Sequence, residues 1–279
     1  MMIANVHERL KETRRLLESV VPDSMTAEFE ARQLLAFALD TDKLSPAVYD
    51  TCLTDEQQKI LSCAVSRRLN REPLQYIIGE WEFMGLPFYV NECVLIPRPD
   101  TETLCEAVEA FIKGRSKQKF SLIDVCTGTG CVGISLSVRN GIETVLSDIS
   151  EACLEIAGKN CVRNGVRCEL IRSDLFENVE GSYDIITVNP PYIRTKEIDS
   201  LEPEVKREPT LALDGGEDGL DFYRRIREEF KKHINAGGLL AMEIGFDQGE
   251  SVRNLFLYCG KVSVIKDMCG CDRVVTVEI

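Results

Sequence analysis

Residues 120–141 read FSLIDVCTGTGCVGISLSVRNG, and this stretch decides the fold. It begins with apolar and β-branched residues, which are typical of a buried strand. The strand runs into the glycine-rich turn Asp124–Gly130, and an apolar helix follows that turn and ends at Gly141. A strand, a glycine-rich turn and a helix in this order predict one unit of an α/β sheet, with backbone N–H groups that face a ligand at the helix start.

The same alternation continues to the end of the chain. Strands are expected at residues 143–150, 168–174, 183–192 and 239–245, and helices at residues 99–113, 151–165, 218–238 and 248–260. Alternating strands and helices predict a mostly parallel sheet with helices on both faces. Two further strands, 262–268 and 271–279, have no helix between them. This pair predicts one antiparallel strand closing a seven-stranded, Rossmann-like sheet.

The part of the chain before this sheet has a different pattern. In residues 1–73 apolar side chains recur at helical spacing, which predicts a small N-terminal helical domain. Residues 74–97 are rich in aromatic and β-branched side chains around glycines, and they predict a β-hairpin linker that turns near residues 84–87. The α/β domain then occupies residues 98–279.

Composition and charge exclude several classes of function. No apolar run in the 279 residues approaches the roughly 18 needed to span a membrane. The N-terminus is charged and helical in pattern and lacks a signal-peptide core, so we expect a cytoplasmic protein without a membrane association. The net charge of −13 repels phosphate backbones and argues against direct binding of DNA.

The twelve cysteines do not form a metal-binding pattern. No two stand as C-x-x-C, and only His7 and His233 are present to help them ligate a metal. We therefore expect no metal site, and we interpret the cysteines as reduced thiols that mostly serve as small core residues.

The glycine-rich turn alone does not identify the ligand. Gly128, Gly130 and Gly133 satisfy the G-x-G-x-x-G spacing of dinucleotide sites, so the turn leaves two classes of nucleotide ligand open. The next strand ends at Asp148, 18 residues after Gly130, where a carboxylate can bind both hydroxyls of a ribose. Both observations indicate a nucleotide-like ligand at the carboxyl edge of the sheet.

The strand that ends at residues 186–193, ITVNPPYI, indicates the chemistry. Proline has no N–H and cannot continue a central strand, so the chain must leave the sheet here with carbonyl groups free to accept hydrogen bonds. The side chain of Asn189 offers a further acceptor at the same edge. A dehydrogenase explains the glycines and Asp148 but not this rim, whereas an S-adenosyl-L-methionine-dependent methyltransferase explains all three.

Together these motifs identify a family. The chain from about residue 71 to its end resembles the HemK/PrmC family, the protein-(glutamine-N5) methyltransferases of peptide chain release factors. The resemblance rests on REPLQYIIGEWEF, VLIPRPDTE, SDLF, VNPPYI, EPTLALDGGEDGLDFYRRI and MEIGFDQG. It implies a methyltransferase domain over residues 98–279, S-adenosyl-L-methionine as cofactor, and the glutamine of the Gly-Gly-Gln loop of class I release factors as substrate.

The resemblance also implies roles for individual residues. Those expected to bind the cofactor are Cys126, Thr127, Gly128, Thr129, Gly130, Asp148, Leu175 and Asn189. Those expected to hold the glutamine are Asn189, Pro190, Pro191 and Tyr192, of which Asn189, Pro190 and Tyr192 are the expected catalytic residues. Asn189 and the carbonyl of Pro190 would each accept one N–H of the amide, while Tyr192 would pack against the amide plane.

Two departures from the family pattern are visible. Cys126 stands where the family usually has glycine, and Leu175 stands where some relatives have an aromatic residue. Arg98, Thr101 and Glu102 either line the active site or cap the following helix, and the sequence leaves both roles open.

Two questions of function remain as alternatives. An adenine-N6 nucleic-acid methyltransferase shares the NPPY motif, but it needs a basic, aromatic recognition segment that the chain does not show. The helical N-terminal domain either contacts the release factor away from its loop or only shields the flank of the catalytic domain. We expect a monomer.

Overall fold

The structure, a computed structural model, describes residues 5–116 and 119–279 and contains two compact units. Unit 1 consists of Met1–Gly79 together with Glu202–Arg207, and unit 2 consists of Glu80–Leu201 and Glu208–Ile279. The short segment Glu202–Arg207 therefore belongs to unit 1, although it lies in sequence within the α/β part of the chain.

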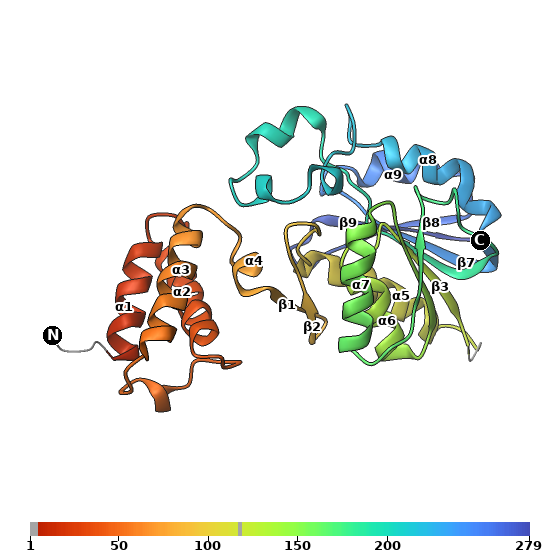
Figure 1. Cartoon of the computed structure of the whole chain (residues 1–279). Coiled ribbons are helices and arrows are strands. Elements are labelled where there is room, and N and C mark those ends of the chain that lie inside the picture. The colour runs from red at the N-terminus through yellow and green to blue at the C-terminus, as the bar shows by residue number, and fades with distance from the viewer. Residues whose placement is uncertain (1–4, 117–118) are drawn as a thin grey trace. The chain divides into compact units, whose positions relative to one another are not determined.

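The part of unit 1 before residue 80 is helical and is coloured red to orange in Figure 1. Its α-helices are α1 (Val6–Leu17), α2 (Ser24–Ala38), α3 (Asp55–Leu69) and α4 (Leu74–Ile78). Side chains cap the first three, because each helix start leaves backbone N–H groups unpaired. Asn5 with Glu8 and Thr54 with Gln57 form capping boxes, and Asp23 caps α2.

An ion-pair cluster fixes the segment Glu202–Arg207 within unit 1. Arg68, which is 4% exposed, donates two hydrogen bonds to Glu30, at 2.7 and 3.1 Å. It also donates to Glu204 at 2.7 Å, and Arg71 donates to the other oxygen of Glu204 at 2.6 Å. A buried guanidinium needs such partners, because an unpaired charge away from water is costly.

Unit 2 is built on a seven-stranded sheet with the strand order β5-β4-β3-β6-β7-β9-β8. The strands are β3 (Ser121–Val125), β4 (Glu143–Asp148), β5 (Glu169–Arg172), β6 (Tyr183–Val188), β7 (Ile234–Glu243), β8 (Lys261–Lys266) and β9 (Asp272–Glu278). The predicted mostly parallel, seven-stranded sheet is confirmed. The antiparallel strand is β9, and it lies between β7 and β8 rather than at the edge.

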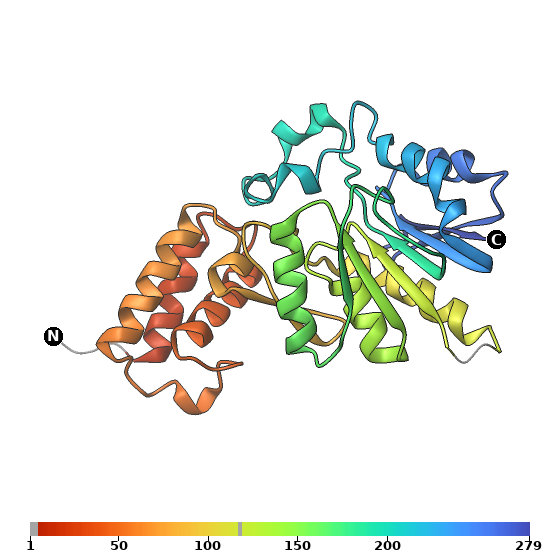
Figure 2. The ribbon, with the colours of Figure 1, turned by 45° about the vertical axis from the view of Figure 1, so that its right-hand side comes forward.

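Helices cover both faces of this sheet (Figures 1 and 2). The helices α5 (Glu102–Lys113), α6 (Cys131–Asn140) and α7 (Glu151–Arg163) contribute to one apolar core. The helices α8 (Asp221–Glu229) and α9 (Gly249–Phe256) contribute to the core on the other face. The central strands are buried on both sides, which explains their nearly continuous apolar sequences.

The hairpin is shorter than predicted. Its strands are β1 (Glu80–Phe83) and β2 (Leu86–Tyr89), and the turn falls at residues 84–85. Residues 74–78, which were expected to join the hairpin, form helix α4 instead. Phe83 and Phe88 pack in the core of unit 2, so the hairpin is part of that unit.

The predicted helix over residues 218–238 is also too long. Helix α8 ends at Glu229, and β7 already begins at Ile234, where it pairs with Tyr183 of β6. Pairing with β6 therefore overrides the local helical pattern of residues 234–238. Within the described ranges, no helix is both long and apolar enough to span a membrane.

All twelve cysteines are free thiols. The expectation that most are core residues is only partly met. Cys105, Cys131, Cys153 and Cys161 are buried, whereas Cys52, Cys63, Cys269 and Cys271 are exposed. No group of three or more His, Cys, Asp or Glu side chains in the described part of the chain is arranged to hold a metal ion.

Candidate active site

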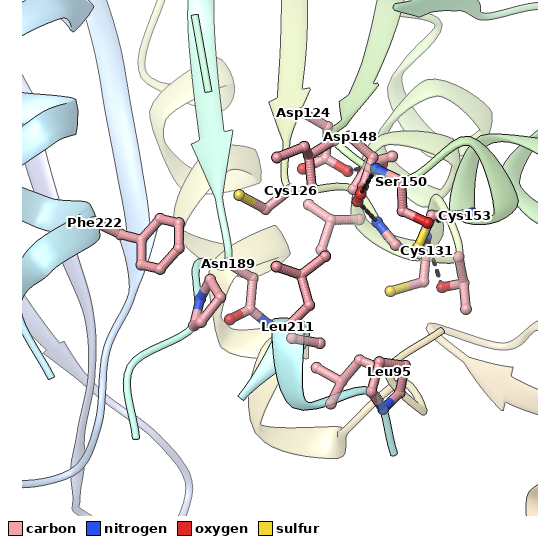
Figure 3. A pocket seen from close by; sticks show the side chains of 18 of the residues that line it. Leu95, Asp124, Cys126, Cys131, Asp148, Ser150, Cys153, Asn189, Leu211 and Phe222 are labelled. Atoms are coloured by element: carbon pink, nitrogen blue, oxygen red, sulfur yellow. Dashed lines mark hydrogen bonds between the residues drawn. The ribbon is translucent and has the colours of Figure 1, made fainter. Parts of the chain in front are cut away.

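A cavity of about 300 Å³ lies at the carboxyl ends of the central strands of unit 2 (Figure 3). The turns after β3, β4, β5 and β6 contribute residues 126–129, 148–150 and 173–175, and Asn189 and Pro191. This is the edge at which open α/β sheets bind ligands. The rest of the lining comes from β3, from the starts of α6 and α7, from the segment before α5, from residues 209–212 and from α8.

The turn after β3 has an unusual backbone. Cys126 has φ of +57° and Gly128 has φ of +53°, both in the left-handed region. A side chain in this region costs roughly 1 kcal/mol, which explains why glycine suits the position of Cys126. A Cβ atom on Gly128 would meet no other atom within 4 Å, so the backbone of this turn faces open space in the cavity.

Asp124 of β3 fixes this turn by hydrogen bonds. The carboxylate is 2% exposed and accepts hydrogen bonds from the hydroxyls of Thr127 and Thr187 at 2.6 and 2.7 Å. It also accepts from the backbone N–H of Gly133 at 3.2 Å. Burial raises the pKa of Asp124 to about 6, although the two hydroxyls act in the opposite direction. The hydrogen bonds join β3, its turn, β6 and the start of α6 into one rigid frame.

Asp148 closes β4 and lines the cavity. One carboxylate oxygen accepts from the N–H of Gly128 at 2.9 Å, and the other accepts from the N–H of Ser150 at 2.9 Å. Burial raises its pKa, and these two backbone bonds oppose that rise. Each carboxylate oxygen can accept more than one hydrogen bond, so both keep capacity for a diol.

Apolar side chains form the wall beside Asp148. Leu175 is 3% exposed and adopts φ of +51°, which turns the chain sharply after β5. Ile149, Leu175 and Val132 all line the cavity, and the surroundings suit a flat apolar ring rather than a charged group.

Asn189 follows β6 directly and projects at the same cavity (Figure 3). Its Nδ2 donates to the hydroxyl of Thr101 at 3.4 Å. Among the described residues none donates to its Oδ1, which remains an acceptor. The carbonyl oxygen of Pro190 likewise has no donor among the residues that the structure describes.

Two glycines and one amide fix the backbone after Asn189. A Cβ atom on Gly215 would lie 2.7 Å from the Cα of Tyr192, so only glycine lets these two segments approach. The Nε2 of Gln248 donates to the carbonyl oxygens of Tyr192 and Gly219, at 2.9 and 3.1 Å. Residues 189–192 are therefore held by contacts from two other loops.

Tyr192 points away from the cavity. Its hydroxyl donates to the carboxylate of Glu243 at 3.2 Å, and the ring packs against the apolar core around α8 and α9. Burial raises the pKa of this phenol. Neither Tyr192 nor Pro190 is in the cavity lining.

The segment VLIPRPDTE also contributes to the cavity lining. Arg98 and Thr101 line it, whereas Glu102 instead accepts from the backbone N–H of Met84 at 2.8 Å. Glu208 ties this segment down by accepting from Ile96 N at 3.0 Å and from the guanidinium of Arg98. Burial raises the pKa of Glu208, and Arg98 opposes that rise.

Most of the residues singled out from the sequence lie together at this cavity. The ones in its lining are Cys126, Thr127, Gly128, Thr129, Asp148, Leu175, Asn189 and Pro191. Gly130 is absent from the lining, because a Cβ there would lie 2.7 Å from the side chain of Ile134 and the residue packs α6 against its neighbours. Sequence reasoning missed Leu211, Phe222 and Arg225 of the lining and the buried Glu243 beside it.

Two families match parts of the chain. Residues 8–79 match the PrmC N-terminal domain, and residues 101–205 match the Methyltransferase small domain. A release factor glutamine methyltransferase of Thermodesulfovibrio yellowstonii is 38% identical over 256 residues, which cover 89% of this chain and 91% of the relative. Another from Clostridium acetobutylicum is 44% identical over 222 residues, which cover 76% of each chain.

Solved structures share the fold at low identity. A methyltransferase from Pyrococcus furiosus is 17% identical, with a TM-score of 0.52 over 80% of this chain and 97% of that chain. The hMettl16 catalytic domain is 15% identical, with a TM-score of 0.58 over 85% of this chain and 86% of that chain. Both support the Rossmann-like methyltransferase fold.

Proposed function

Because this chain belongs to the release factor glutamine methyltransferase family, we propose that it methylates a release-factor glutamine with S-adenosyl-L-methionine. The target is N5 of the side chain in the Gly-Gly-Gln motif of class I release factors. The resemblance to the HemK/PrmC family that the motifs indicated is confirmed by these relatives, as is the interpretation as an S-adenosyl-L-methionine-dependent enzyme.

The residues of the cavity fit the cofactor. The turn after β3 presents backbone to open space at Gly128, where a Cβ would meet nothing within 4 Å. Asp148 supplies acceptors for a ribose, and Ile149 and Leu175 supply an apolar wall for an adenine. The volume of about 300 Å³ is at the lower end of the range for small-molecule sites. We propose that residues 126–129, Asp148 and Leu175 hold the cofactor.

The single observation that carries the proposal is the orientation of Asn189. Its Nδ2 is engaged by Thr101, and its Oδ1 is left as an acceptor at the cavity. The carbonyl of Pro190, a residue outside the cavity lining, accepts from none of the described residues, and we propose it as the second acceptor. A primary amide has two N–H groups and needs two acceptors of this kind.

Orientation is the main chemical task of these residues. The nitrogen of an amide is a poor nucleophile because its lone pair is delocalised into the carbonyl. When bound, the cofactor supplies an electrophilic methyl group on a sulfonium. Two hydrogen bonds to Asn189 and Pro190 would hold the nitrogen so that its lone pair faces that methyl. The amide proton leaves after transfer, so no general base is required for the attack.

Pro191 and Tyr192 support this arrangement in different ways. Pro191 lines the cavity and stiffens the rim next to Asn189. We predicted that Tyr192 packs against the amide plane of the substrate, but its hydroxyl is bonded to Glu243. We therefore propose that Tyr192 supports the rim from behind.

The alternative of adenine-N6 methylation is not favoured. The relatives with high coverage are release factor glutamine methyltransferases, and the net charge of −13 disfavours a nucleic-acid backbone. We further propose that the protein is a cytoplasmic monomer that does not bind DNA directly, consistent with a release-factor substrate.

Labelled cofactor and a purified class I release factor test the proposal. We expect a mass increase of one methyl group on the Gly-Gly-Gln peptide and none on a release factor whose glutamine is replaced by asparagine. Label on other peptides, or equal label on the substituted factor, refutes the assigned target. An adenine-containing duplex serves as the competing substrate.

A further inference from the structure

The sheet places an unexpected carboxylate beside Asn189. Strands β6 and β7 are parallel neighbours, and Val188 pairs with Met242. Asn189 directly follows Val188, and Glu243, the last residue of β7, directly follows Met242, so the two lie side by side at the carboxyl edge. Glu243 is only 1% exposed. A carboxylate so deeply buried is costly unless hydrogen bonds compensate for the loss of water.

The contacts of Glu243 are incomplete for such a group. Its Oε1 accepts from the hydroxyl of Tyr192 at 3.2 Å. Its Oε2 is buried without a partner of good geometry among the described residues. The hydroxyl of Thr101, which contacts Asn189 at the same edge of the sheet, lowers the pKa of the carboxylate, as a neighbouring donor does. Thr101 is itself 2% exposed, so its hydroxyl is largely shielded from water.

If the hydroxyl of Thr101 donates to Glu243, it determines which end of the Asn189 amide faces that hydroxyl. A hydroxyl that donates its single proton to a carboxylate has only lone pairs left for other neighbours. The partner of Thr101 on its other side must then be a donor, and the donor present is Nδ2 of Asn189, at 3.4 Å. The amide of Asn189 thereby has its Oδ1 turned to the cavity.

We propose that Glu243 is a positioning residue for the transfer site: through the hydroxyl of Thr101 it selects the orientation of Asn189 in which Oδ1 faces the substrate amide. This inference rests on the proposed function for the identity of the substrate, but the orientation itself is a property of the free enzyme. The reverse orientation would set an NH₂ group against the NH₂ of the glutamine, and two donors repel.

The protonation state of Glu243 decides which way the hydrogen bonds run from Glu243 through the hydroxyl of Thr101 to Asn189; this chain of hydrogen bonds is called the relay. A protonated carboxyl can donate to Thr101, whose own proton then goes to Oδ1 of Asn189 and reverses the amide. Burial raises the pKa of Glu243 to about 7, and the hydroxyl of Thr101 and the charge of Arg273 oppose the rise. The titratable and charged groups that face it are Tyr192, Tyr223, Arg273, Asp100 and Cys131.

The kinetic test uses two variants and their combination. Glu243→Gln allows an N–H to donate to Thr101, and Thr101→Val removes the hydroxyl. We expect each to lower kcat about tenfold, because the substrate amide is misoriented, with the KM for the cofactor changed less than about twofold. The double variant should match Thr101→Val alone, since Glu243 acts through Thr101.

The pH profile separates positioning from a general structural defect. The kcat of the wild type should rise as the pH passes about 7, and this step should vanish in Glu243→Gln. A matched control is Glu109→Gln. Glu109 of α5 is another buried carboxylate of unit 2, and it accepts a hydrogen bond from Arg139 of α6 at 2.6 Å. This control should leave kcat and the profile unchanged. Unchanged kcat in Glu243→Gln, or additive losses in the double variant, overturns the proposal.

A second measurement needs no release factor. In ¹⁵N-labelled enzyme, the side-chain amide signals of Asn189, assigned by their loss in Asn189→Ala, should titrate near pH 7 in the wild type and not in Glu243→Gln. Signals that stay constant from about pH 6 to 8 in the wild type overturn the relay. If the wild type fails to methylate any release factor, the proposed function fails, and these spectra still decide the role of Glu243.

Discussion

The substitution Glu243→Gln should stabilise unit 2 at alkaline pH while it impairs transfer. The carboxylate is 1% exposed, and burial raises its pKa from 4.5 to about 7. The folded protein binds this proton more tightly than the unfolded chain does. The contribution of Glu243 to the free energy of unfolding is therefore most favourable below about pH 4.5. That contribution is lost as the pH rises through about 7, where the folded state must bury a charge.

The size of the effect follows from the same values. A rise from 4.5 to about 7, at 1.36 kcal/mol per pKa unit, corresponds to about 3 kcal/mol of destabilisation by wild-type Glu243 above pH 7. A neutral glutamine avoids this cost and keeps an oxygen to accept from Tyr192. We therefore expect the variant to unfold with a free energy up to about 3 kcal/mol higher at pH 8, and nearly equal to the wild type at pH 4.5.

Urea denaturation at constant ionic strength measures the difference. Trp81 is the only tryptophan and lies in β1 of unit 2, so its fluorescence follows the unfolding of that unit. Transitions at about pH 4.5, 6 and 8 give the free energy of unfolding for both proteins.

The control Glu109→Gln should behave in the opposite way. Arg139 lowers the pKa of Glu109, so this carboxylate contributes stability that is present above the unfolded value and lost as the pH falls. The substitution should therefore destabilise the protein at pH 8. A Glu243→Gln variant that is less stable than the wild type at pH 8, or that differs from it equally at every pH, refutes the reasoning.

Three further outcomes are expected. Asn189→Ala removes the acceptor at the cavity and should lower kcat about 10³-fold. Its affinity for the cofactor, measured by calorimetry, should change about threefold or less. Retained methyl transfer by this variant contradicts the role assigned to Asn189. Gly215→Ala brings a Cβ within 2.7 Å of Tyr192 Cα and should lower kcat about tenfold. The control Gly114→Ala, whose nearest contact is at 3.5 Å, should leave kcat unchanged. Equal kcat values for the two variants in a methylation assay would exclude a role for this close approach. Removing residues 1–70 should raise the KM for full-length release factor and not for a Gly-Gly-Gln peptide, and an unchanged KM for the full-length factor contradicts a contact by the N-terminal part.

The sequence determined the elements whose signals are local. The strand, glycine-rich turn and helix of residues 120–141 are predicted by the sequence alone. Apolar periodicity and the left-handed backbone of glycines are local properties, which depend only on residues close in the sequence. The rim at Asn189 was equally readable, since two prolines end any central strand. The carboxyl ends of successive parallel strands meet at one edge, so the sequence alone predicts that the residues after them lie together.

Other features depended on pairing between distant segments. Residues 234–238 look helical alone, but they become strand because Tyr183 of β6 pairs with Ile234. Glu243 is an acidic residue at the end of an apolar strand, in the segment LLAMEIG. Asp124 and Asp148 follow the same pattern in their strands, so this pattern is the sequence signal that indicates a site residue at Glu243. The sequence near Glu243 does not predict which side chains contact it.

Only the tertiary structure decided which side chains meet. Glu243 lies 54 residues after Asn189, and they become adjacent because β6 and β7 are neighbours in register. Likewise, Tyr192 turns its hydroxyl to Glu243 instead of the cavity because a buried carboxylate is the available acceptor. Local sequence sets backbone conformation through short-range sterics, whereas the partners of a buried polar group are set by strand order and by the requirement that its hydrogen bonds be satisfied.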